Sequence, residues 1–415
     1  YFNRRILQEA TRKHIPLLER FSFLGIYSNN LDEFFRVRVA TQSRIAECRD
    51  KLASEESEKA TKIIKQINKL NSQYSLEYEH SVKIVTEELR QEGIFLVKDN
   101  EVTEEQLQFI RQYYRDHLNG FIMPVWLSAI KMLDNETDES IYLGIKFHYT
   151  TGGKRTATEY AYLELPVSVV GRFVCLPDCD LGLRDFEAYS FKFTRDAEME
   201  IDNDLRTGTL QKISKGVKSR KRGQPLRVLY DASMPKDLLK RILKRLDLDQ
   251  LDTVLASGRY HNHKDFMKFP DFGRKDLKYP AWYPILKKEL DGPESILTKI
   301  QQRDRFIHVP YHSFDSFIRV LQEAAMSPLV KSIKITLYRL AKESKVVKAL
   351  IGAARNGKKV TVSIELLARF DEASNIYWSK RMQEAGINVI FGVEGLKVHS
   401  KIMHISMTKG PDIAC

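Results

Sequence analysis

The C-terminal part of the chain alternates short apolar segments with helical ones, and this alternation constrains the fold more than any other feature. Segments rich in β-branched residues predict strands at 306–310, 332–339, 359–367 and 387–393. The segments between them have helical periodicity, at 313–325, 344–356 and 372–385. Parallel strands need crossovers of about a dozen residues, usually helices. We therefore predict an α/β domain with a largely parallel sheet over residues 304–415.

A further strand is predicted over residues 395–405, and it carries a histidine between two lysines. Because alternate residues of a strand share a face, Lys397, His399 and Lys401 are expected to project together. Two ammonium groups beside an imidazole favour its neutral form, which a nitrogen nucleophile requires, and they attract phosphate. Taken alone, the same residues are equally compatible with an ordinary, partly buried histidine.

Two arginines stand at the ends of consecutive predicted strands, Arg339 and Arg369. Ligands bind at the carboxyl ends of parallel strands, and a guanidinium is always charged and can bind phosphate through two hydrogen bonds. The pair is therefore predicted to form a phosphate clamp. The structural alternative is a salt bridge from Arg369 to Asp371 or Glu372.

Residues 1–93 are almost continuously helical in pattern and predict an N-terminal helical domain. Pro16 is suited to start a new helix, and Gly93 to follow the end of the last one. An otherwise apolar stripe is interrupted by Asn29 and Asn30, whose amides compete for backbone hydrogen bonds inside a helix. We therefore expect a bend or a functional site there.

Residues 94–303 predict an α+β domain. Thr103 and Gln106 form a capping box at the start of a helix. His261 and His263 could be metal ligands, but a hydrogen-bonded loop is favoured because no carboxylate or cysteine has a suitable spacing. The other predicted elements are strands at 140–149, 158–165, 168–176 and 186–193, and a helix at 235–246.

Composition restricts the partners of the chain. The 67 Lys and Arg residues outnumber the 55 Asp and Glu residues, giving a net charge of +12. This excess favours a polyanion, which could be nucleic acid, an anionic membrane or a phosphate polymer. The 4 cysteines indicate a reducing, cytoplasmic setting. No apolar run approaches the roughly 20 residues of a membrane span, so we expect a soluble protein.

Five segments together resemble polyphosphate kinases of the phosphohistidine class. They are 26–34 (IYSNNLDEF), 258–262 (GRYHN), 338–339 (YR), 368–372 (ARFDE) and 395–401 (GLKVHSK). Their order makes the resemblance far more specific than any one motif. It implies an N-terminal helical domain, a head domain used in dimer contacts, and two C-terminal domains of phospholipase D-like fold. On this template the chain is a fragment that holds the first two domains and most of the third.

The resemblance also implies an activity, the reversible transfer of the γ-phosphate of ATP to inorganic polyphosphate. His399 would be the catalytic residue that becomes a phosphohistidine, and Lys397 and Lys401 would add positive charge around it. ATP and Mg2+ are the implied cofactors. The family pattern assigns Asn30 to nucleotide contact.

The same pattern associates Arg339 and Arg369 with the magnesium site. A guanidinium cannot ligate a cation, so we interpret this as contact through shared phosphate oxygens or water. The implied partners are polyphosphate, ATP and ADP, and a second copy of the chain in a dimer or tetramer. Nucleic acid is not expected, and a cytoplasmic location with peripheral membrane association is compatible with the charge.

Two other functions stay open at this point. A phospholipase D-like phosphodiesterase would use the same histidine chemistry, but it would need neither ATP nor the Asn30 motif. The aspartate that ends the phospholipase D motif is also missing, with Ser406 near that place. A non-catalytic polyanion-binding protein would explain the basic charge, and it predicts no covalent phosphate on any histidine.

Overall fold

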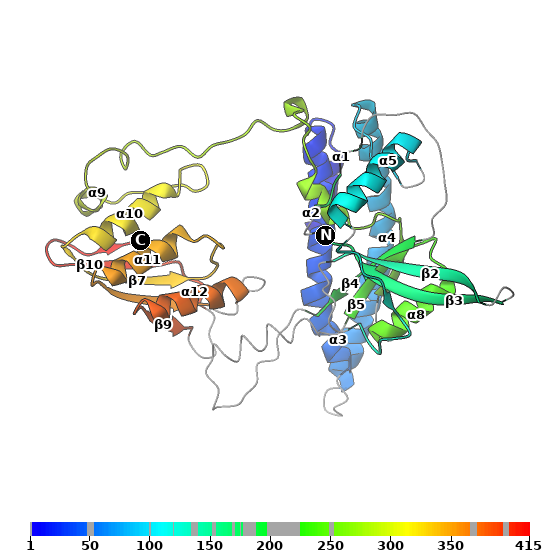
Figure 1. Cartoon of the computed structure of the whole chain (residues 1–415). Helices are drawn as coiled ribbons and strands as arrows, with labels where there is room; N and C mark the ends of the chain where they lie inside the picture. The colour runs from blue at the N-terminus through cyan, green and yellow to red at the C-terminus, as the bar shows by residue number, and fades with distance from the viewer. Residues whose placement is uncertain are drawn as a thin grey trace. The chain divides into compact units, whose positions relative to one another are not determined.

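The chain forms two compact units, drawn in Figure 1. The first comprises Tyr1–Glu198 and Arg220–Pro280, and the second comprises Met199–Ser219 and Ala281–Cys415. The computed structural model describes residues 2–47, 54–98, 101–118, 120–133, 140–151, 155–167, 171–174, 176, 188–196, 225–248, 253–365, 372–392 and 398–415. The domain boundaries predicted above stay predictions.

The beginning of the first unit is helical, as predicted. Pro16 is the residue before the second helix, and Gly93 has a φ of +77° after the last one, a left-handed conformation that glycine adopts without strain. The elements are α1 (Phe2–Thr11), α2 (Leu17–Phe34), the π-helix η1 (Phe35–Val39), α3 (Ala40–Glu47) and α4 (Ser54–Gln91).

The expected bend at Asn29 and Asn30 is wrong. Helix α2 runs through both residues, and the backbone departs from α-helical geometry only at the π-helix that starts at Phe35. The reason is tertiary packing, because Phe21 and Leu24 of the same helix are fully buried. Burial of such side chains outweighs the small helix preference that two asparagines remove.

A short 3-10 helix, η5 (His263–Lys268), packs closely on α2. The ring of Phe266 stacks on Phe21 with centroids 4.0 Å apart. A Cβ atom added at Gly25 would lie 2.7 Å from the backbone nitrogen of Met267. Glycine is therefore required at this crossing, where the segment after the 258–262 motif meets the helix of the 26–34 motif.

The middle of the chain forms an α+β structure, as predicted. The capping box is present, since the Thr103 hydroxyl accepts from the backbone of Gln106 and the Gln106 side chain accepts from the backbone of Thr103. A six-stranded sheet has the order β1-β3-β2-β4-β5-β6, and only β5 and β6 pair in parallel. The elements are α5 (Glu104–Tyr113), η3 (Tyr114–Leu118), β1 (Val125–Trp126), β2 (Tyr142–Thr151), β3 (Arg155–Glu164), β4 (Ala188–Arg195), β5 (Pro225–Asp231), α8 (Lys236–Leu246), β6 (Thr253–Ser257) and η6 (Lys275–Leu277).

Two features of this sheet differ from the sequence analysis. The segment 168–176 is not a strand at any of its described residues, 171–174 and 176. Strands β5 and β6 were not predicted, although both are short apolar runs, because no clear alternation marks them. Fully buried Leu238 and Ile242 show that α8 contributes to the core of this sheet.

The second unit contains a five-stranded sheet of order β11-β10-β7-β8-β9. Strands β7, β8 and β9 are parallel, as predicted, whereas β10 pairs antiparallel with β7. The elements are α9 (Ile296–Gln302), α10 (Asp315–Met326), β7 (Val330–Leu337), α11 (Lys345–Arg355), β8 (Lys359–Ile364), α12 (Glu372–Glu384), β9 (Asn388–Phe391), β10 (Met403–Met407) and β11 (Ile413–Ala414).

No described helix of either unit combines the length and apolar character needed to cross a membrane.

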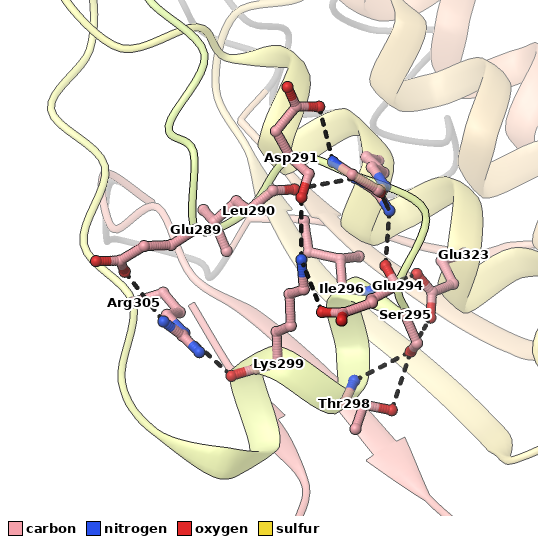
Figure 2. A network of polar contacts seen from close by, with 12 residues as sticks. Glu289, Leu290, Asp291, Glu294, Ser295, Ile296, Thr298, Lys299, Arg305 and Glu323 are labelled. Carbon is pink, nitrogen blue, oxygen red and sulfur yellow. Dashed lines mark hydrogen bonds and ion pairs between the residues drawn. The ribbon is translucent and has the colours of Figure 1, made fainter.

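A polar network surrounds the start of α9 in this unit, and Figure 2 shows it at close range. Glu323 of α10 accepts hydrogen bonds from the Ser295 hydroxyl and from the backbone of Ile296, at the start of α9. Lys299 of α9 donates to the carbonyl of Asp291 at 3.0 Å. The contacts of Glu323 tie the start of α9 to α10, and the contact of Lys299 ties α9 to the segment before it.

One predicted strand of this unit is wrong, and another is correct only in part. Of the strand expected at 395–405, residues 403–405 lie in β10, and residues 395–397 lie outside the described residues. Residues 398–402 are not part of a strand. The Thr336 hydroxyl binds their backbone in place of a strand partner. It accepts from the N–H of Ile402 at 2.9 Å and donates to the carbonyl of Ser400 at 2.6 Å. Residues 306–310 form no strand either. Pro310 has no N–H to donate to a ladder, and the chain turns there with a hydrogen bond from His312 N–H to the His308 carbonyl.

Replacing Gly25 with alanine tests the crossing of α2 and η5. The added methyl group has no space beside the Met267 backbone, so Gly25→Ala should lower the stability of the first unit by about 1–3 kcal/mol. The control is Gly352→Ala in α11, where nothing lies within 4 Å of the added atom. That variant should gain up to about 1 kcal/mol from higher helix propensity. Thermal and urea unfolding of both variants measures this, and an unchanged Gly25→Ala protein would contradict the close packing.

Candidate functional site

His399 lies beside the carboxyl ends of the parallel strands of the second sheet. Because β10 runs antiparallel to β7, the residues just before Met403 lie beside the carboxyl end of β7. The His399 side chain is exposed, and the ring of Tyr338 lies nearly perpendicular to its imidazole, with centroids 5.0 Å apart. The imidazole therefore opens to solvent at the edge where ligands of parallel sheets bind.

Lys401 also lies in this cluster, although not as predicted. The prediction that Lys397, His399 and Lys401 share one face of a strand is wrong for His399 and Lys401, because residues 398–402 do not form a strand. Lys401 instead donates to the backbone carbonyl of His399 at 2.5 Å, and its ammonium lies 4.6 Å from the centroid of the Tyr338 ring. Lys397 lies outside the described residues.

A buried polar frame holds the backbone of this cluster. The N–H of Val398 donates to the Glu365 carboxylate at 3.0 Å, and Glu365 follows β8 directly. Asn375 of α12 is fully buried and donates to the carbonyls of Tyr338 at 2.8 Å and Glu365 at 3.0 Å. One side chain thus joins the ends of two neighbouring strands. The sequence analysis missed both Glu365 and Asn375, and the only signal was a polar residue next to an apolar run.

Of the two arginines, the structure describes one. Arg339 is exposed and comes two residues after the end of β7, next to Tyr338, so it belongs to the same edge of the sheet as His399. Arg369 and Asp371 lie outside the described residues. The clamp and its salt-bridge alternative therefore both stay predictions.

Asn30 lies on α2 in the first unit, and its side chain is partly exposed. Two residues further on, Asp32 is buried and accepts hydrogen bonds from Lys192 of β4 at 3.0 Å and Arg227 of β5 at 2.9 Å. Lys192 also donates to the Asn262 side chain at 3.1 Å. The 26–34 and 258–262 motifs therefore meet in one buried polar cluster.

The charges of this cluster depend on each other. Burial acts most strongly on Asp32 and would raise its pKa, but attraction by Lys192 and Arg227 outweighs burial and leaves the pKa below its ordinary value. Burial lowers the pKa of Lys192 and of Arg227, against the opposing attraction of Asp32. The single carboxylate thus faces two buried cations.

Of the two histidines of the 258–268 segment, His261 is buried and His263 is half-buried, and both are neutral at pH 7. Burial, with Lys192 nearby, lowers the pKa of His261 to about 4 and that of His263 to about 3. His261 contacts the Gly258 carbonyl through Nδ1 at 3.0 Å, and His263 packs between the rings of Tyr78 and Phe266.

A magnesium ion needs oxygen ligands, commonly one or two carboxylates together with phosphates of the substrate. Within the described ranges, no group of three or more His, Cys, Asp or Glu is placed to hold an ion. Arg339 does not fit as a direct ligand either, because a guanidinium has no lone pair to offer. Its fork fits a phosphate oxygen that a metal ion shares.

Fold and site together define a multidomain α/β and α+β protein with an exposed histidine at the carboxyl edge of a parallel sheet. Three family models match the chain: the polyphosphate kinase N-terminal domain at 1–97, the middle domain at 181–269 and C-terminal domain 1 at 295–414. Together they match most of the chain. The chain belongs to the polyphosphate kinase family.

Individual relatives agree with this assignment. The chain is 36% identical over 440 residues to a polyphosphate kinase of Vibrio parahaemolyticus, and the match covers 99% of this chain and 62% of that protein. For a polyphosphate kinase of Escherichia coli K12 the identity is 33%, covering 99% of this chain and 63% of that protein. The crystal structure of polyphosphate kinase from Porphyromonas gingivalis superposes with a TM-score of 0.75 at 28% identity, covering 97% of this chain and 60% of that one. The chain thus spans less than two thirds of the length of these relatives.

Asn375 is the residue to change in a test of the polar frame. Asn375→Leu keeps the branched shape of the side chain but removes the donor to two backbone carbonyls, so it should destabilise the second unit by about 2–5 kcal/mol. Ser379→Ala on the same helix is the control, because the fully buried Ser379 hydroxyl has no hydrogen-bond partner among the described residues. Its loss should be neutral or stabilising. Urea unfolding decides, and equal effects of the two changes would refute the frame.

Proposed function

We propose that the protein transfers the γ-phosphate of ATP reversibly to inorganic polyphosphate, with His399 as the group that carries the phosphoryl group between them. The observation that supports this most is the placement of His399. Its imidazole is exposed at the carboxyl edge of the parallel strands while the frame of Glu365 and Asn375 holds its segment. Membership of the polyphosphate kinase family agrees with it.

In the first step, a ring nitrogen of neutral His399 attacks the γ-phosphorus of ATP. A P–N bond forms as the bond to the bridging oxygen breaks, and ADP leaves with that electron pair. In the second step, a terminal oxygen of polyphosphate attacks the phosphorus and the P–N bond breaks. Dividing the transfer lets one histidine serve a nucleotide and a polymer in turn.

The cationic side chains supply electrostatic stabilisation, which is most of what phosphoryl transfer requires from a protein. Arg339 and Arg369 neutralise the non-bridging oxygens of the transferred group, and Lys401, with Lys397, adds positive potential around His399. Bound Mg2+ would neutralise charge on the phosphates of ATP, reaching the arginines through phosphate oxygens or water. Asn30 contacts the nucleotide.

The finer partners follow from the family resemblance. We propose that the protein acts as a homo-oligomer, a dimer or tetramer, in the cytoplasm. Its excess of basic residues, +12 in net charge, suits a polyphosphate chain and is compatible with peripheral attachment to an anionic membrane.

Replacing the nucleophile tests the reaction. His399→Ala should abolish polymer synthesis and the acid-labile, alkali-stable label that γ-labelled ATP and magnesium leave on the whole protein. His404→Ala is the matched control, since His404 lies five residues further along and pairs with Asp412 at 3.2 Å. It should keep the label, as should His261→Ala. A label on His399→Ala would refute the assignment, and no label on the unaltered protein would favour a phosphodiesterase or a polyanion-binding protein.

A second prediction concerns the arginines. Arg339→Lys and Arg369→Lys should each lower turnover by on the order of a hundredfold while folding is kept, because a point charge cannot replace a bidentate fork. Arg355→Lys provides a control, since exposed Arg355 ends α11 and precedes β8, at the opposite edge of the sheet. Steady-state rates of polymer synthesis measure the effect. Near-normal rates in both arginine variants would return these residues to a structural role.

A further inference from the structure

The buried cluster around Asp32 has an arrangement that the proposed reaction does not itself explain. Asp32, Lys192 and Arg227 come from three elements, α2, β4 and β5, and their exposed fractions are only 7%, 4% and 4%. Burying charges is costly unless they are paired and hydrogen-bonded. A cluster of this kind stabilises little compared with apolar packing, and its best-attested role is to fix one geometry.

Each cation that contacts Asp32 is itself held by a second contact. Lys192 donates to Asn262, whose amide in turn donates to Asp265 at 2.6 Å. The guanidinium of Arg227 lies 4.8 Å from the centroid of the Phe35 ring. The carboxylate therefore meets donors whose positions are already fixed, which sets the position of the end of α2 against the sheet.

Asp32 and Asn30 lie on opposite sides of α2. Residues two apart are separated by about 200° around a helix. The side of Asp32 includes Gly25 and Phe35 and is buried, whereas the side of Asn30 includes Glu33 and Phe34, which are exposed. Asp32 thus anchors helix α2 on its buried side, and Asn30 lies on the opposite side of the helix.

The place of this anchor along the chain matters as well. Asp32 lies in the last turn of α2, directly before the π-helix Phe35–Val39. A π-turn inserts a residue into the helical repeat and is common near functional sites. A contact that fixes the last regular turn keeps this irregularity from changing the direction in which Asn30 points.

We infer that Asp32 is a positioning residue for the nucleotide, holding the end of α2 through Lys192 and Arg227 so that Asn30 keeps the orientation in which it contacts ATP. The inference rests on the proposed function, in which Asn30 touches the nucleotide. Asp32 acts through Asn30 and not on the substrate.

A double-mutant cycle on the whole protein tests this. Asp32→Asn keeps the shape of the side chain and removes the charge that pairs with both cations. Measured where circular dichroism shows a folded protein, it should raise the KM for ATP by on the order of tenfold, since small displacements of a contact group are costly. Asn30→Ala should raise the same KM, and adding Asp32→Asn to Asn30→Ala should change it no further.

A control separates positioning from general destabilisation. Arg20, at the other end of α2, is 3% exposed and binds Glu88 of α4 through two hydrogen bonds, at 2.5 and 3.0 Å. Glu88→Gln should lower the melting temperature and leave the KM for ATP unchanged. If Asp32→Asn does not fold, Lys192→Met takes its place, because it leaves Asp32 paired with Arg227, and it should raise the KM in the same direction.

The outcomes distinguish the inference from the proposed function. If Asn30→Ala leaves the KM for ATP unchanged, the proposed role of Asn30 fails and the inference fails with it. If Asn30→Ala raises the KM but folded Asp32→Asn or Lys192→Met does not, or if the effects of Asn30 and Asp32 add, only the inference is overturned. An equal rise in KM for Glu88→Gln would also overturn it.

Discussion

The antiparallel pairing of β10 with β7 is the constraint on which the candidate site depends. It places the start of β10 where β7 and β8 end, so that His399 and Arg339, sixty residues apart in the chain, come to the same edge of the sheet. A parallel β10 would put its first residues at the opposite edge. The hydroxyl of Thr336 then binds the backbone of Ser400 and Ile402 in place of a regular ladder, and the His399 side chain just before them is exposed.

Local chemistry explains which parts of this fold could be predicted. The helix start at Thr103 and the helix end before Gly93 follow from residues close together in the chain. The same holds for the parallel order of β7, β8 and β9. The two clearest errors were made where distant residues decide. Packing kept α2 helical through two asparagines, and a hydroxyl some sixty residues away interrupted the strand expected at 395–405.

The candidate site divides in the same way. The motifs singled out His399 and Arg339, whose proposed roles rest on side-chain chemistry that a sequence displays. Glu365 and Asn375 could not be identified, since their function is to bind backbone groups of other segments. The contacts of Asp32 span 160 and 195 residues, and nothing in the sequence pairs Lys192 or Arg227 with a particular carboxylate. Reactive groups can be found from a sequence more readily than the residues that hold them in place.

The contacts of Lys401 have a chemical consequence for His399, the proposed nucleophile beside it. An ammonium group next to a neutral imidazole can donate a proton to the nitrogen lone pair, and a blocked lone pair cannot attack phosphorus. Here the ammonium donates to the carbonyl of His399 and lies over the face of Tyr338, whose ring is nearly perpendicular to the imidazole. Its positive charge still acts across the aromatic ring. The arrangement therefore places the Lys401 ammonium close to the His399 imidazole without using that ammonium to block the lone pair of the imidazole.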